Sequence, residues 1–249
     1  MKSTTDRDSN FELLRIVAMM MIVGFHSVYK GNIIDASFMN KILIDIVWHW
    51  GEIGVNVFLL ISGYHLAYQE YNRRKIYYIV LQVLFYLVFT TIVACLYWNV
   101  PITSYIKANC FPVLSARYWF ITVYIYIYIL SPYIKMAIEN MNKEKQKAVA
   151  FTLFFVWSFF PSFIYPMLTN DYSSTETMPF YSRFVWGVSV YIIGAILYSF
   201  RYEITLKKSL VWFICIVLIQ VGYIVLTELN IIKLFGSSAV YFWPPNSVS

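Results

Sequence analysis

Seven long apolar runs alternate with short polar or basic segments along the chain. Each run is close to the roughly 20 residues that an α-helix needs to cross a bilayer. None shows the strict apolar–polar alternation of an outer-membrane barrel strand. The pattern therefore predicts an all-α, polytopic membrane helix bundle with about seven transmembrane helices, over Phe11–Tyr29, Ile53–Tyr68, Ile76–Trp98, Tyr118–Ile134, Ala148–Leu168, Phe184–Phe200 and Leu210–Leu229.

The composition supports a membrane protein. Hydrophobic residues make up 60% of the 249 positions and charged residues only 13%, whereas soluble domains have about 25% charged residues. Nine Gly, eight Pro and three Cys are too few for a disordered, collagen-like or disulfide-stapled chain. Cys95 and Cys215 lie in apolar runs and Cys110 in a loop, so we predict neither a disulfide framework nor a metal site.

The basic residues predict the orientation of the bundle. With a cytoplasmic N-terminus, the inner segments hold twelve Lys and Arg and the outer segments six. This is the bias of the positive-inside rule. It also accounts for the net charge of +6, because the basic residues are spread over several segments and form no nucleic-acid-binding patch.

The connections between runs predict a single membrane domain over residues 1–249, without linkers or internal repeats. We expect the outer segments Lys30–Glu52 and Asn99–Arg117 to hold an extracytoplasmic substrate. Within the first of these, Ile42–Trp50 is too short to span and is predicted to be an interfacial or re-entrant piece. Residues 231–249 hold a short apolar stretch and are predicted to form an irregular tail.

Two ionisable residues in the first run, Arg15 and His26, need a reason to be there, because such groups are costly inside a membrane. They are 11 residues apart, which places them within about 20° of one helix face and about 16 Å apart. We expect both to face an interior groove. Arg15 could hold a phosphate, and His26 could take a proton from a hydroxyl.

Structural roles are the alternatives for both residues. Arg15 could instead pair with Glu12, three residues before it, or extend to lipid headgroups. His26 could be a hydrogen-bonding residue between helices.

The second run carries the small or polar residues Asn56, Ser62 and Gly63. Asn56 and Ser62 are candidates for stabilising an oxyanion, and close helix packing is the favoured reading of Gly63. We interpret His49 and His65 as interfacial residues.

Two further segments hold candidates. Arg73 and Arg74 follow the second run on the inner side, where they could act as topology anchors or bind a phosphorylated ligand such as a coenzyme. In the aromatic fourth run, Trp119 is a candidate substrate contact. Most of the aromatic rings in this run are expected to lie at the membrane interface or to pack between helices.

Three motifs together resemble the membrane acyltransferase 3 family, and the likeness extends over most of the chain. They are Phe11–Arg15 running through to His26, Gly54–Phe58 leading into Ser62–Tyr64, and Trp119–Phe120 in a helix that ends in Ser131–Pro132. Within that family, the sequence resembles the branch that acts on bacterial surface polysaccharides.

The resemblance implies a multi-pass plasma-membrane enzyme of bacterial type. It would transfer an acyl group, usually acetyl from acetyl-CoA, to a hydroxyl of an envelope polysaccharide or another surface acceptor. The donor is a substrate, and no permanently bound cofactor is implied. By the resemblance His26 is essential, Arg15 supports it, and Arg73 and Arg74 belong to the donor side.

The family commonly has about ten helices, so we expect its C-terminal helices to be missing from this chain. A membrane transporter or flippase, or an inactive truncated remnant, is the alternative function.

Overall fold

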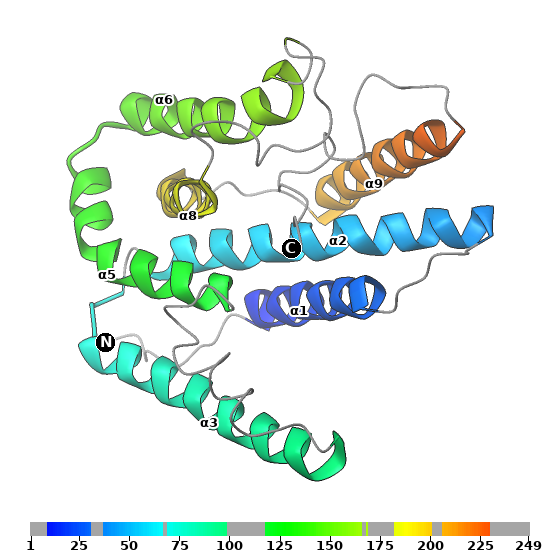
Figure 1. Cartoon of the computed structure of the whole chain (residues 1–249). Helices are drawn as coiled ribbons and strands as arrows, with labels where there is room; N and C mark the ends of the chain where they lie inside the picture. Colours follow the sequence, from blue (N-terminus) through cyan, green and yellow to red (C-terminus); the bar gives the residue numbers. More distant parts are fainter. Residues whose placement is uncertain are drawn as a thin grey trace. The chain divides into compact units, whose positions relative to one another are not determined.

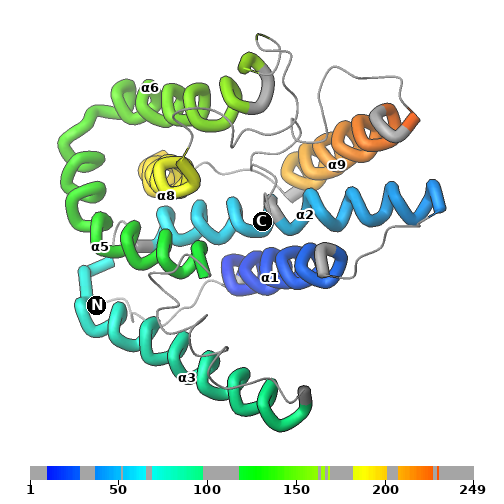
Figure 2. Tube along the Cα trace, in the orientation of Figure 1, coloured from blue at the N-terminus to red at the C-terminus, as the bar shows by residue number. Residues whose placement is uncertain are grey.

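A computed structural model describes residues 9–30, 37–66, 69–98, 118–165, 168, 182–200 and 206–229 (Figures 1 and 2). These residues are almost entirely helical and include no strand. The helices are α1 (Ser9–Lys30), α2 (Phe38–Leu66), α3 (Arg73–Trp98), α5 (Trp119–Glu139), α6 (Lys143–Phe154), the π-helix η1 (Phe155–Ile164), α8 (Arg183–Phe200) and α9 (Leu206–Glu228).

Six of the described helices are long and apolar enough to cross a membrane, namely α1, α2, α3, α5, α8 and α9. The prediction of an all-α membrane protein is confirmed. The fifth predicted run instead forms α6 and η1, where the hydrogen-bond register widens before Pro161. Proline lacks the N–H that a regular helix uses, which is consistent with a changed register at this place. The expected tail, residues 231–249, lies outside the described residues.

The second helix is longer than the sequence pattern predicts. α2 is continuous over 29 residues, so the separate interfacial or re-entrant piece at Ile42–Trp50 is wrong. Most of the expected loop Lys30–Glu52 is helical too. A continuous helix satisfies its backbone hydrogen bonds internally, which apolar surroundings require. Gly51 lies within this helix, and Phe25 of α1 occupies the space that a side chain at Gly51 would need.

By contact density the chain divides into two compact units, and each is described by itself. Unit 1 contains Met1–His65 and Ile138–Ser249, and unit 2 contains Leu66–Ala137.

Within unit 1, α1 and α2 pack antiparallel (Figure 1). At one end, the ring of Phe11 lies 4.4 Å from that of His65 between centroids. At the other end, the Phe25 ring lies 4.9 Å from that of Trp48. Between these ends, a Cβ at Gly54 would come 2.6 Å from the carbonyl oxygen of Ala18, so the helices approach closely only because this position lacks a side chain.

A second close approach joins α2 to α8, which Figure 1 shows down its axis where it crosses α2. A Cβ at Gly63 would clash with the carbonyl oxygen of Tyr191, and one at Gly194 would clash with that of Leu60. The side chains of Tyr191 and Leu59 are fully buried. The predicted packing role of Gly63 is confirmed, and this crossing forms the core of unit 1.

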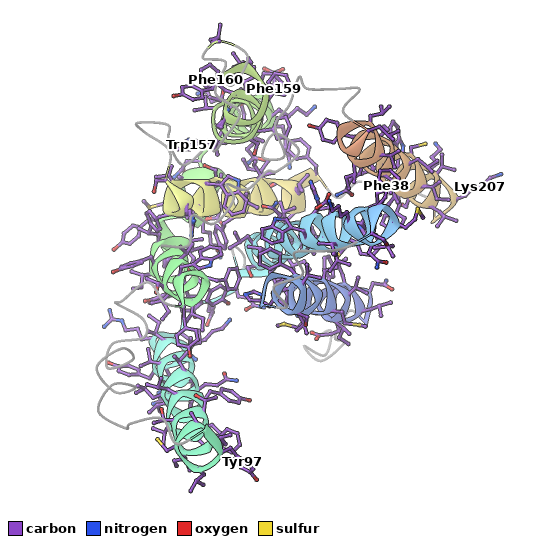
Figure 3. All side chains as sticks on the ribbon, turned by 45° about the vertical axis from the view of Figure 1, so that its right-hand side comes forward. Phe38, Tyr97, Trp157, Phe159, Phe160 and Lys207 are labelled. Carbon is purple, nitrogen blue, oxygen red and sulfur yellow. The ribbon has the colours of Figure 1, made fainter. Side chains whose placement is uncertain are left out.

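Side chains of α6 donate hydrogen bonds to carbonyl groups at the ends of two helices, α5 and α8. Gln146, buried on α6, donates from Nε2 to the carbonyl oxygens of Ile138 (3.0 Å) and Met141 (3.2 Å), at the end of α5. Lys143 donates to the carbonyl oxygen of Ser199 near the end of α8. These donors satisfy carbonyl groups that a helix leaves open at its C-terminus. Both α6 and η1, whose side chains are shown in Figure 3, pack against α8.

In unit 2, Tyr128 of α5 holds the residue that precedes α3. Its hydroxyl accepts a hydrogen bond from the N–H of Asn72 (3.0 Å) and donates to the carbonyl oxygen of the same residue (3.2 Å). The Tyr71 ring stacks on that of Tyr128. Most of α3 is exposed apolar surface, and Tyr97 projects from its far end (Figure 3), as is typical of a lipid-facing helix.

The α2–α8 crossing predicts opposite effects for the same substitution at different glycines. Gly63→Ala and Gly194→Ala should each cost about 1–3 kcal/mol, because the new methyl group meets a backbone oxygen that cannot move aside easily. The temperature at which half of the detergent-solubilised protein is lost from its monodisperse peak should fall accordingly.

Gly222→Ala in α9 is the matched control, since a Cβ there has no neighbour within 4 Å among the described residues. Its effect should be neutral or favourable, because Ala favours a helix over Gly by about 0.5–1 kcal/mol. Equal melting of all three variants would contradict the described crossing.

Candidate functional site

His26 lies on α1 with its side chain exposed, and its ring is held by its own helix. Its Nδ1 is 2.8 Å from the carbonyl oxygen of Ile22. A carbonyl can only accept, so in the neutral ring Nδ1 carries the proton and Nε2 keeps a lone pair. The arrangement presents a proton-accepting nitrogen to whatever lies beside α1.

The prediction that His26 faces a bundle interior is wrong for the described structure. The buried line of α1 includes Ala18 and Phe25, which are seven residues apart and turned toward α2. His26 follows Phe25 by one residue and therefore projects about 100° away from it. α2 covers the line of Phe25 and leaves the neighbouring edge of α1 open.

Arg15 shares this edge of α1 and forms an ion pair. Its Nη1 lies 2.7 Å from Oε1 of Glu12, and the two side chains are 35% and 47% exposed. The pairing with Glu12 that the sequence offered as an alternative is confirmed. A guanidinium has five N–H donors, so one such contact leaves it able to bind an anion as well.

The two oxyanion candidates lie on different faces of α2. Val47, Gly51 and Gly54 mark the face turned toward α1. Ser62 is 11 residues after Gly51 and returns to that face, whereas Asn56 lies about 200° around the helix from Gly54. The antiparallel register brings Ser62 to the level of Arg15 and not of His26.

The remaining candidates belong to unit 2, so their position relative to α1 is not described. Arg73 and Arg74 are exposed in the first turn of α3. Oδ1 of Asn72 accepts the N–H of Arg74 at 3.0 Å, which caps the helix. Trp119 begins α5 with its ring edge-on to that of Phe120.

A polar line on α2 escaped the sequence interpretation. Asp45, His49 and Asn56 recur at helical spacings of four and seven, on the face opposite α1. His49 is only 6% exposed, and its ring donates from Nδ1 to the carbonyl oxygen of Asp45. The spacing was visible in the sequence, but ending the helix at Trp50 cut the line in two. No group of His, Cys, Asp and Glu among the described residues could hold a metal ion.

A comparison with protein-family models matches residues 8–248 to the acyltransferase domain of the acyltransferase 3 family. The chain belongs to the acyltransferase 3 family. The match covers both compact units and nearly the whole chain. Neither the comparison with curated proteins nor that with solved structures found a match.

Membership confirms the resemblance that the three motifs indicated, and with the six apolar helices it indicates a multi-pass membrane protein with acyltransferase activity.

The different exposure of the histidines predicts their reactivity. Diethyl pyrocarbonate acylates an unprotonated imidazole nitrogen, so His26 should be modified several times faster than the buried His49. Mass spectrometry of peptides from the briefly treated, detergent-solubilised protein measures both rates in one sample. Modification of His49 at the rate of His26 would contradict the described burial.

Proposed function

We propose that this member of the family is an integral membrane O-acyltransferase. It transfers an acyl group, in the simplest case acetyl, from acyl-CoA to a hydroxyl of a cell-envelope polysaccharide or another surface acceptor. The observation that carries the proposal is the imidazole of His26, with Nδ1 bonded to Ile22 and Nε2 open, in a chain of this family. The proposed location is the bacterial plasma membrane, with the N-terminus in the cytoplasm.

The proposed reaction begins when Nε2 of His26 takes the proton of the acceptor hydroxyl as its oxygen attacks the thioester carbon. A C–O bond forms, the C–S bond breaks, and the leaving thiolate recovers the proton from the imidazolium. General-base catalysis of this kind contributes about 10²–10⁴-fold. Direct attack by Nε2 on the thioester, followed by transfer from an acyl-imidazole, uses the same lone pair.

The donor is proposed to bind through its phosphates. Arg15 keeps N–H donors beyond the one directed at Glu12. In unit 2, taken by itself, Arg73 and Arg74 present two exposed guanidinium groups at the start of α3, where the helix dipole also favours an anion. Phosphate binding by several guanidinium groups is charge-assisted and weakens as salt is added.

Ser62 is a better candidate than Asn56 for contact with a substrate bound along α1. Ser62 lies on the face of α2 turned toward α1, whereas Asn56 lies on the opposite face. Ser62 and Asn56, and Trp119 in unit 2, are all proposed as substrate contacts.

Loss of the imidazole tests the proposed base directly. His26→Ala should lower the transfer of labelled acetyl from acetyl-CoA to surface glycan by about 10²–10⁴-fold. The assay uses membranes with matched protein levels. Unchanged transfer would contradict the assignment of His26 as the catalytic base.

Ser27→Ala is a matched control for this variant. Ser27 is also exposed on α1 and bonds to a carbonyl four residues back, that of Val23, at 2.9 Å. It should keep normal transfer, which separates loss of the base from a disturbance of the helix.

The proposed donor site predicts a kinetic split. Arg73→Ala and Arg74→Ala should each raise KM for acetyl-CoA by about tenfold, the size of one lost charge-assisted contact, and change kcat little. Increasing ionic strength should raise KM more in the native protein than in the variants.

Lys207→Ala and Lys208→Ala are the controls, because both lysines are exposed at the start of α9. Figure 3 shows Lys207 at this end of the helix. Both substitutions should leave KM unchanged. Equal effects of all four substitutions would indicate a general charge effect and contradict a local donor site.

A further inference from the structure

We propose that Phe25, seated between Gly51 and Trp48 of α2, is a positioning residue that holds the imidazole of His26 in its reactive orientation. This inference rests on the proposed function of His26. It gives a role to Phe25, Trp48 and Gly51, none of which is among the residues assigned to the reaction.

Gly51 provides the seat for Phe25. A Cβ built at Gly51 would overlap Cβ of Phe25 and would lie 2.6 Å from its Cγ, so no other residue fits there without moving α1. The Phe25 side chain is only 8% exposed. The close approach of the α2 backbone at Gly51 therefore limits where the Phe25 side chain can lie.

Trp48 fixes the orientation of the Phe25 ring. The two rings lie edge to face, with centroids 4.9 Å apart and planes at 76°. Such aromatic pairs contribute about 0.5–1.5 kcal/mol beyond the area that they bury, and they favour one ring orientation. Gly51 and Trp48 are three residues apart and so act from one turn of α2.

The Phe25 ring in turn borders the imidazole. Its centroid lies 5.1 Å from that of His26, and the planes meet at 88°. Together with the Nδ1 bond to Ile22, this contact restrains the exposed ring on two sides. Ile22 is itself packed against α2, since a Cβ at Gly54 would come 3.0 Å from its Cγ1.

Both restraints on His26 therefore lead back to α2. An exposed imidazole without such support would sample several rotamers, and only a fraction of them would direct Nε2 toward the acceptor hydroxyl. Misplacement of a catalytic group by about 1 Å can cost about 10²-fold in rate. We expect the contact to act on kcat and not on donor affinity.

The experiment compares Phe25→Leu, which removes the ring, with Phe25→Tyr, which keeps it. Phe25→Leu should lower kcat by about 10-fold to 100-fold with KM for acetyl-CoA unchanged. Phe25→Tyr should keep most of the native kcat. Phe89→Leu, at an exposed ring on α3, is the matched control and should keep both constants.

Nitrogen NMR of histidine-labelled protein provides a readout that does not depend on turnover. The chain has three histidines, so the His26 signals can be assigned by substitution. In the native protein His26 should show one neutral tautomer with a hydrogen-bonded Nδ1–H. Phe25→Leu should give averaged shifts of two tautomers, and Phe25→Tyr should return the native signals.

The outcomes separate the inference from the proposed function. If His26→Ala abolishes transfer while Phe25→Leu keeps both kcat and the native His26 signals, the positioning role is overturned and the proposed function stands. If His26→Ala keeps full transfer, the proposed function fails and the positioning role in catalysis fails with it. If Phe25→Leu does not fold, kcat and the His26 NMR signals are measured for Trp48→Phe instead. If both are unchanged in Trp48→Phe, the inference is overturned.

Discussion

The close approach of α1 and α2 is the contact on which the candidate site depends. Two glycines, Gly51 and Gly54, remove the side chains that would keep the helices apart. Between apolar helices in a bilayer there is little hydrophobic driving force, so association relies on tight packing of this kind. The contact determines which line of α1 is buried and therefore which edge, with Arg15 and His26, stays open.

α2 is the central element of unit 1 because two of its faces carry glycine-mediated packing. One receives α1 at Gly51 and Gly54, and the other receives α8 at Gly63. A polar line with His49 and Asn56 runs along the side away from α1. The helix thus joins α1 to the buried core around Tyr191, and the proposed positioning of His26 depends on its contact with Phe25.

Local periodicity explains what the sequence predicted well. The runs of apolar residues predicted most of the membrane helices, and the spacing of three residues offered the Arg15–Glu12 ion pair as an alternative that the structure shows. These properties depend on neighbours within a few turns of one helix. The motifs also identified the family, which the match over residues 8–248 confirms.

Contacts between distant segments could not be predicted in this way. Exposure of His26 depends on α2 covering Phe25 and leaving the next residue open, and no periodicity in α1 specifies the partner. The bond between Tyr128 and Asn72 joins positions 56 residues apart. The length of α2 was missed because hydropathy windows divide at Gly51–Glu52, whereas the backbone hydrogen bonds continue through them.

Disulfide cross-linking tests the register of α1 and α2 most directly. A Cβ at Gly24 would lie 3.3 Å from Cγ1 of Val47, which suits a disulfide between cysteines at these positions. In a background without native cysteines, G24C with V47C should cross-link under mild oxidation, as seen by mass spectrometry, while V23C with V47C should not. Failure of the first pair, or equal cross-linking of both, would contradict the helix pairing that presents His26.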